Sequence, residues 1–375
     1  MTSIQQSTRR YDTWLREQLK GDLVKQDLAR KHDKMKESAF SFLRATYWRW
    51  AETILDVCPD LADAKTVLAV GDIHFENYGT WRDVDGRLVW GVNDYDESAA
   101  MPFTLDLVRL STSALLGRGR HPISESEIAG AILKGYRQGL SEPSPIVLDR
   151  DRRWLRDLLV VSDKARSKFW EKIASMRSNA APPAFLAAID AGMPESKLII
   201  KTSRRTAGTG SLGRPRWVGV ANWRGAPVVR EAKALVGSAW TLAHKGAHRQ
   251  IRYDDVAAGT FRPIDPWHSV RGNIVVRRLS PNNRKLEVDD GFAVFSTDVL
   301  QVMGLDLANV HRGTASGDEL KLELSKLKRG WLAQSSMKAA DAVAQDYKQW
   351  KCSSSFAAFA RAFDKVGLMS KHIER

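Results

Sequence analysis

Four polar side chains in two short segments are of the types that phosphoryl transfer requires. Asp72 and Asn77 lie five residues apart in GDIHFEN, and Asp94 and Asp96 flank a tyrosine in NDYDE. In such a reaction one carboxylate orients the attacking hydroxyl or accepts its proton. An asparagine and a second carboxylate hold Mg²⁺, which prefers oxygen ligands and bridges the phosphates of a nucleotide. A competing interpretation is that these side chains only cap turns.

The elements around these residues predict that the two segments meet. TVLAVGD (66–72) is a short apolar, β-branched run typical of a buried strand, so Asp72 follows a strand. Residues 80–92 contain a D-x-D-G turn between two strand-like arms and predict a hairpin. That hairpin brings Asp94 alongside the loop that contains Asp72 and Asn77. Asp96 is the rival metal ligand, because residues two apart on an extended strand share a face.

A glycine-rich segment is the candidate for phosphate binding. Gly208, Gly210, Ser211 and Gly213 belong to GTGSLG, which lies between two predicted strands. Glycine permits positive φ and lets the backbone approach a phosphate closely. Basic residues flank the segment on both sides, which favours an anion. Glycine-rich segments are also common as plain turns.

These motifs together resemble a known group of proteins. GDIHFENYG, VNDYDE and LDLVRLSTS are similar to motifs of aminoglycoside phosphotransferase-like kinases, and more closely to DUF2252, a bacterial family of undefined biochemistry. The resemblance extends to KMKESAFSFLRA, GTGSLG, VVREA, VVRRL and GLDLANVHRG, and so spans most of the chain. It implies a kinase-like phosphotransferase fold.

The resemblance also implies roles for individual residues. Asp72 takes the position of the catalytic acid–base residue, and Asn77 and Asp94 take the positions of the metal ligands. His74 is a further candidate in the catalytic loop, which we expect to order the loop rather than to act as a base. Asp106 is expected to hold the catalytic loop through a buried hydrogen bond.

The order of the motifs differs from that of a kinase-like chain, in which the glycine-rich loop precedes the catalytic loop. We therefore expect a circular permutation, with a convergent, unrelated topology as the alternative. A second departure is Arg230 in VVREAK, which stands where such a fold places a lysine that holds phosphates. Lys233 follows three residues later, so on a strand it should face the opposite side. Arginine and lysine are not interchangeable at a tight site, which leaves the activity in doubt.

Composition and charge narrow the class of protein. The chain has 375 residues, a net charge of +14 and two cysteines, and it lacks a long apolar run and an apolar leader. We therefore expect a cytoplasmic protein with neither a disulfide scaffold nor a membrane span. Residues 51–100 contain 3 basic and 11 acidic side chains, whereas residues 201–250 contain 10 basic and 1 acidic. This contrast predicts a cleft between an acidic and a basic wall, unless both blocks are merely solvated.

The predicted fold is α+β, a kinase-like two-lobed and circularly permuted arrangement. Residues 1–195 would form large-lobe helices with the catalytic loop and the metal-binding hairpin. Residues 196–292 would form a small antiparallel β lobe that binds nucleotide, and residues 293–375 would add C-terminal helices to the large lobe. The cleft would lie between 71–96 and 204–232.

The predicted function is ATP- and Mg²⁺-dependent phosphoryl transfer to a small hydroxyl-bearing molecule; another nucleoside triphosphate is possible. The segment from Asp94 to Asp106 is too short for the peptide platform of a protein kinase, which disfavours a protein substrate. One alternative is a non-catalytic nucleotide-binding regulator, motivated by Arg230. The other is a nucleic-acid-binding protein, motivated by the net charge, which we do not favour.

Overall fold

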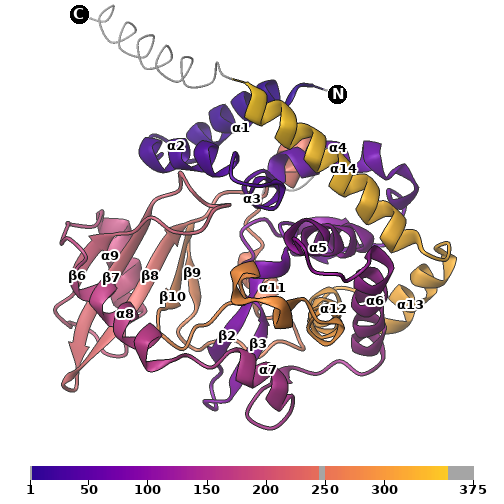
Figure 1. Cartoon of the computed structure of the whole chain (residues 1–375). Coiled ribbons are helices and arrows are strands. Elements are labelled where there is room, and N and C mark those ends of the chain that lie inside the picture. The colour runs from indigo at the N-terminus through magenta and orange to yellow at the C-terminus, as the bar shows by residue number, and fades with distance from the viewer. Residues whose placement is uncertain (1, 245–249, 354–375) are drawn as a thin grey trace, which may run out of the picture.

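The protein folds into a mixed α+β structure, seen in a computed structural model that describes residues 2–244 and 250–353 (Figure 1). Within these residues, no helix is long and apolar enough to cross a membrane. The α-helices are α1 Ile4–Gln18, α2 Lys25–Lys34, α3 Ala39–Ala45, α4 Tyr47–Val57, α5 Phe103–Gly117, α6 Glu125–Ser141, α7 Arg153–Leu158, α8 Asp163–Ala174, α9 Pro183–Ala191, α10 Trp240–Ala243, α11 Tyr253–Ala257, α12 Thr297–His311, α13 Gly317–Lys326 and α14 Trp331–Cys352. The strands are β1 Thr66–Ala69, β2 Tyr78–Arg82, β3 Leu88–Val92, β4 Ala99–Pro102, β5 Ile146–Val147, β6 Lys201–Arg204, β7 Arg216–Trp223, β8 Ala226–Ala234, β9 Ser269–Arg271 and β10 Ile274–Arg278.

Two small antiparallel sheets carry the segments that contain Asp72, Asn77, Asp94 and Asp96. β1 pairs with β4, and β2 pairs with β3 in a hairpin that β5 extends. The hairpin is confirmed, with Thr80 opposite Trp90 and Gly86 in the turn at φ 76°. The positive φ explains the glycine there. β5 lies in a region for which the sequence pattern predicts helices. It was not predicted because a strand of two residues is too short to show a detectable period.

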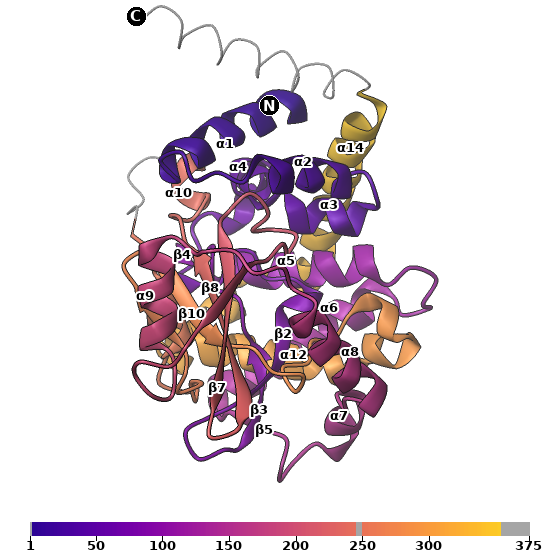
Figure 2. The same ribbon diagram turned by 90° about the vertical axis from the view of Figure 1, so that its left-hand side faces the viewer.

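The glycine-rich segment and VVREAK belong to a five-stranded antiparallel sheet of order β6-β7-β8-β10-β9 (Figures 1 and 2). α9 packs on one face of this sheet against β7, β8 and β10. The approach is close: a Cβ on Gly219 of β7 would lie 2.4 Å from Ile189 of α9. The first strand of this sheet, β6, begins at Lys201, and Lys197 shortly before it has φ 64°.

A helical layer packs against the two small sheets. α6 crosses α12 so closely that a Cβ on Gly135 would lie 1.7 Å from the carbonyl oxygen of Gln301, and one on Gly304 would lie 2.1 Å from that of Ile132. α14 packs on α5 and also contacts α1, α3 and α4. The C-terminal helix α14 thus packs on helices from the N-terminal part of the chain. The part of the predicted C-terminal segment at 354–375 lies outside the described residues.

Candidate functional site

The loop that carries Asp72 is held by a buried carboxylate. Asp106 of α5 accepts hydrogen bonds from the backbone N–H groups of Val70 and Gly71, at 2.7 and 2.9 Å, and contacts His311 of α12 at 3.1 Å. Gly71 has φ 79°, and a Cβ there would lie 2.2 Å from the carbonyl oxygen of Glu97. The expected structural role of Asp106 is confirmed.

This arrangement predicts that Asp106→Asn destabilises the protein. An amide places an N–H group against one of two backbone donors and removes the charge beside His311, at an expected cost of about 3 kcal/mol in the free energy of unfolding. Denaturant titration followed by circular dichroism measures this cost. The matched control is Asp33→Asn at an exposed position of α2, which should change the stability by less than about 0.5 kcal/mol. Equal stabilities of the two variants would contradict the role of Asp106.

Asp72 lies between the buried guanidinium of Arg109 and the glycine-rich segment. One carboxylate oxygen pairs with Arg109 of α5, whose side chain is fully buried and lies over the rings of Tyr47 and Trp50. A Cβ on Gly210 would lie 3.1 Å from the other oxygen. Burial raises the pKa of Asp72 to about 7, although Arg109 opposes this shift. A carboxylate with such a pKa can accept a proton near neutral pH.

The three candidate metal ligands line the same cavity as Asp72. Asn77 donates its amide N–H to the backbone oxygen of Asp72 at 2.9 Å, which leaves the amide oxygen as the atom for a metal. The ammonium group of Lys233 lies 3.3 Å from Asp94 and 2.6 Å from Asp96. A positive charge therefore already sits between the two carboxylates. Burial favours the neutral acid, but Lys233 and Lys285 hold the pKa of Asp94 well below its usual range.

These oxygen donors fit Mg²⁺ better than a metal that needs a closed protein cage. Among residues 2–244 and 250–353, no group of three or more His, Cys, Asp or Glu side chains is spaced to hold a metal by itself. Mg²⁺ keeps several waters and commonly takes one or two carboxylates together with substrate phosphates. Asn77, Asp94 and Asp96 supply oxygen atoms of this type to the cavity.

The glycine-rich segment forms the opposite wall of this cavity, which has a volume of about 290 Å³. Gly208, Gly210 and Ser211 line it, and the backbone N–H groups of residues 208–211 make no hydrogen bond to another described residue. Unpaired amides in a glycine-rich turn suit an anion. Gly213 does not line the cavity. It lies at φ 98° against Leu15, Leu23 and Leu28, so its expected role in binding is wrong.

The acidic and basic blocks of the sequence meet at this cavity. Arg214, next to the glycine-rich segment, contacts Asp96 at 3.2 Å and Glu97 at 2.6 Å. Lys233 makes the second link between the blocks through the aspartates described above. The cleft predicted between 71–96 and 204–232 is present, and part of the basic block is buried in ion pairs rather than exposed.

The placement of Arg230 in the phosphate site is wrong. Its guanidinium donates to the backbone oxygen of Gly192 at 2.6 Å and lies over the ring of Trp267. It is therefore on the face of the sheet that α9 covers. Lys233 does lie on the other face, as the alternation along β8 requires. That other face is the one that turns toward Asp94, so the lysine at the site is Lys233.

His74 lines the cavity, but its surroundings disfavour a role as a base. Burial and the nearby Arg44 lower the pKa of His74 well below its usual range. Its ring lies edge-on to Phe40. These contacts agree with an ordering role in the loop, as expected.

A cluster of arginines around one glutamate was not predicted from the sequence. Glu231 of β8 is fully buried and is paired with Arg205, with Arg216 at 2.6 Å and with Arg277 at 2.7 Å. Three guanidinium groups thus share one carboxylate. The cluster leaves an excess of positive charge beside the glycine-rich segment, which a bound anion would balance.

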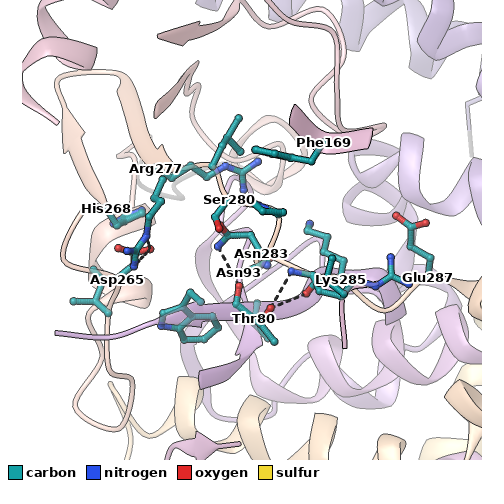
Figure 3. A pocket seen from close by; sticks show the side chains of 18 of the residues that line it. Thr80, Asn93, Phe169, Asp265, His268, Arg277, Ser280, Asn283, Lys285 and Glu287 are labelled. Atoms are coloured by element: carbon teal, nitrogen blue, oxygen red, sulfur yellow. Dashed lines mark hydrogen bonds and ion pairs between the residues drawn. The ribbon is translucent and has the colours of Figure 1, made fainter. Parts of the chain in front are cut away.

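A second, larger cavity of about 530 Å³ adjoins the first. Its walls are partly aromatic, with Trp81, Tyr95, Phe169 and Tyr253 among the lining residues. Figure 3 shows Phe169 and Thr80 on opposite sides of this cavity. The two cavities share four lining residues: Arg205, Arg277, Lys285 and Glu287.

Lys285 is the cation at this junction without an ion pair to any described residue. It lies next to Gly79 of β2 in an isolated antiparallel bridge, and its half-buried side chain lines both cavities. Figure 3 shows it in the wall of the larger one. Burial lowers the pKa of Lys285 to about 8, with Asp94 acting in the opposite direction. The segment after β10 gave no sequence signal for this role beyond its basic residues.

A model of a known protein family matches part of the chain. No curated protein and no solved structure matches the chain. The match covers residues 23–179, a stretch that contains the Asp72 loop and the hairpin and ends before the five-stranded sheet. Over residues 23–179, the chain is similar to a bacterial family described as "Uncharacterized protein conserved in bacteria (DUF2252)", in agreement with the resemblance inferred from its motifs.

Proposed function

We propose that the protein is an ATP- and Mg²⁺-dependent phosphotransferase of kinase-like, circularly permuted fold that acts on a small hydroxyl-bearing molecule. The observation that carries the proposal is one cavity with four features. The carboxylate of Asp72, the oxygen donors of Asn77 and Asp94 and the glycine-rich segment line the cavity. The fourth feature is the buried ammonium of Lys233, which does not line the cavity itself but pairs with Asp94 on its wall. Phosphoryl transfer in kinases uses this combination, with the lysine on the third strand of the sheet that carries the glycine-rich loop. β8 is the third strand of this sheet in chain order.

The two adjoining cavities suit the two parts of a nucleotide. The larger cavity offers aromatic walls to a base, whereas the smaller one offers unpaired backbone amides and cations to phosphates. Arg205, Arg277 and Lys285 lie where the two cavities meet. We place the nucleoside in the larger cavity and the terminal phosphate beside Asp72.

The proposed reaction needs little covalent chemistry from the protein. The hydroxyl oxygen of the substrate forms a bond to the γ-phosphorus, the bond from that phosphorus to the bridging oxygen breaks, and ADP leaves. Asp72 takes the hydroxyl proton. Lys233 and the arginines around Glu231 lie where they can stabilise negative charge on the phosphates. Mg²⁺, held by Asn77 and Asp94, would supply further neutralisation of that charge.

The acceptor is proposed to be a small molecule because the chain after Asp96 is used structurally. Residues 99–102 form β4, which pairs with β1, and α5 begins at Phe103. This connection therefore leaves no length for a peptide platform. The alternative of a non-catalytic nucleotide-binding regulator was suggested by Arg230 in place of a lysine. Lys233 rather than Arg230 faces Asp94, so Arg230 no longer supports that alternative.

Phosphorus NMR tests the proposed function. The protein is incubated with Mg-ATP and pools of small polyols, sugars and amino sugars. We expect ATP signals to decline and a new phosphate monoester signal to appear with at least one pool. The Asp72→Asn variant serves as the control for contaminating kinases. No new phosphorus signal with any pool, or equal rates for the wild type and Asp72→Asn, would contradict the proposal.

Lys285→Met should weaken ATP binding. The variant removes a cation from the junction of the cavities, and a charge-assisted hydrogen bond contributes about 1.5–3 kcal/mol, which corresponds to a rise in Kd of about 10- to 100-fold. Calorimetric titration with Mg-ATP measures the change. Lys201→Met at an exposed position of β6 removes the same charge far from the cavities and should leave Kd within about twofold. Equal Kd values for both variants would exclude Lys285 from the site.

A further inference from the structure

We propose that Lys31 of α2 is a positioning residue that anchors the glycine-rich segment, together with the residues that flank it (205–215), over Asp72, so that the N-terminal helices form part of the nucleotide site. The inference rests on the proposed function for its catalytic consequence. The anchoring itself is independent of any nucleotide. α2 precedes the segment by more than 170 residues in the chain, and Figure 1 shows it above the end of the five-stranded sheet.

Lys31 is a buried cation directed at the segment. Its side chain is 1% exposed, and Nζ donates a hydrogen bond to the backbone oxygen of Gly210 at 2.7 Å. The same ammonium lies 4.8 Å from the ring centroids of both Tyr11 and Trp48, which are stacked on each other. Burying an ammonium is costly, and burial together with Arg214 lowers the pKa of Lys31 to about 7. Such a group is not an accidental surface contact.

Two further contacts attach the segment to the same helices. The backbone N–H of Val24 donates to the carbonyl oxygen of Gly213 at 2.9 Å, and Thr206 donates its hydroxyl to Asp27 at 2.8 Å. Gly213 also packs on leucines of α1, α2 and the connection between them. The N-terminal helices therefore hold the segment near both ends as well as at Gly210.

The contact at Gly210 determines which way the next amide points. In a planar trans peptide, the C=O of one residue and the N–H of the next point in opposite directions. Lys31 fixes the carbonyl of Gly210, so the N–H of Ser211 is turned away from Lys31. Ser211 lines the cavity, and Gly210 lies against Asp72 on that side. Lys31 thus orients an amide that the proposed function assigns to phosphate binding.

Hydrogen–deuterium exchange of the nucleotide-free protein tests the anchor. In Lys31→Met, the hydrogen-bonded amides of Arg205, Leu212 and Arg214 should exchange at least about tenfold faster, while β7 and β8 keep the protection of the wild type. The matched control is Arg30→Met on the exposed side of α2, which removes the same charge and should leave the segment unchanged. Unchanged exchange in Lys31→Met, or equal acceleration across the whole sheet, would overturn the anchor.

Two other variants keep the test decisive if Lys31→Met does not fold. Lys31→Gln retains an N–H donor for Gly210 and should restore most of the protection. Thr206→Val removes the bond to Asp27 from an exposed position of the segment and should speed its exchange by about threefold. If Thr206→Val exchanges like the wild type, or if Lys31→Gln restores no protection, the N-terminal helices do not anchor the segment.

ATP titration separates the anchor from the proposed function. With Mg-ATP, Lys31→Met should raise Kd by about tenfold, because the segment must be ordered before its amides bind. Faster exchange with an unchanged Kd would overturn the positioning role. Faster exchange in a protein whose wild type does not bind ATP would refute the proposed function and leave the anchor intact.

Discussion

Asp72→Asn should lower the rate of the proposed phosphoryl transfer by about 10²–10⁴-fold while Mg-ATP still binds. The substitution keeps the size of the side chain but removes the group that takes the hydroxyl proton, and acid–base assistance typically contributes a factor of this size. Nucleotide binding should persist, because Lys233, Asp94 and the glycine-rich segment are unchanged. Steady-state turnover and calorimetric titration of the same preparation measure both effects.

The structure adds an expected cost in stability for Asp72→Asn. Arg109 is fully buried, and two of its nitrogens have no hydrogen-bond partner among the described residues. Neutralising Asp72 weakens the ion pair, although the amide oxygen can still accept a hydrogen bond, so we expect a loss of up to about 3 kcal/mol. Asp85→Asn at the exposed hairpin turn is the matched control. Turnover like that of this control would show that Asp72 is not the base.

Asp94→Asn should affect binding rather than only turnover. It removes a charged ligand from the proposed Mg²⁺ site and leaves Lys233 with one carboxylate instead of two. Because Mg²⁺ depends on carboxylate oxygens, Kd for Mg-ATP should rise by at least about tenfold, and turnover should fall with it. Calorimetry at several Mg²⁺ concentrations detects the shift.

Asp96→Asn is the comparison that assigns the metal ligand. Asp96 also pairs with Arg214, so its replacement should loosen the glycine-rich segment as well as the contact to Lys233. We expect the Kd of Asp96→Asn for ATP to depend on Mg²⁺ almost as it does in the wild type, whereas the Kd of Asp94→Asn should depend on it differently. The reverse order would make Asp96 the principal ligand. If Asp72→Asn abolishes ATP binding and Asp94→Asn leaves it untouched, both assigned roles are wrong.

The elements around the loop that carries Asp72 were predictable because their signals are local. The D-x-D-G turn and the alternation of its arms predict the hairpin, and the apolar run before Asp72 predicts β1. The same locality explains the expected role of Asp106, which lies on a helix close in sequence to the loop. These residues come together through short connections.

The error at Arg230 shows what local signals omit. Alternation along β8 assigns Arg230 and Lys233 to opposite faces, but it does not say which face turns toward Asp72. That choice depends on α9, a helix that packs on one face of the sheet from a separate part of the chain. The kinase-like pattern of VVREAK pointed to the wrong residue of the two.

The contacts of Lys31 and Lys285 had no sequence signal of their own. A lysine in a polar helix such as α2 is usually solvated, and only the tertiary structure places Lys31 under Gly210. Lys285 lies in an irregular segment after β10, and its proximity to the site follows from the bridge to Gly79. Long-range contacts of this kind depend on topology, which the pattern of one segment does not encode.

We expect the cavity between Asp72 and the glycine-rich segment to bind a Mg²⁺–nucleotide. Calorimetric titration of the wild-type protein with ATP, first with Mg²⁺ and then with a chelator, tests it most directly. We predict saturable binding to one site per chain with Mg²⁺ and binding weaker by at least about tenfold without it. No saturable binding at millimolar ATP under either condition would contradict the account.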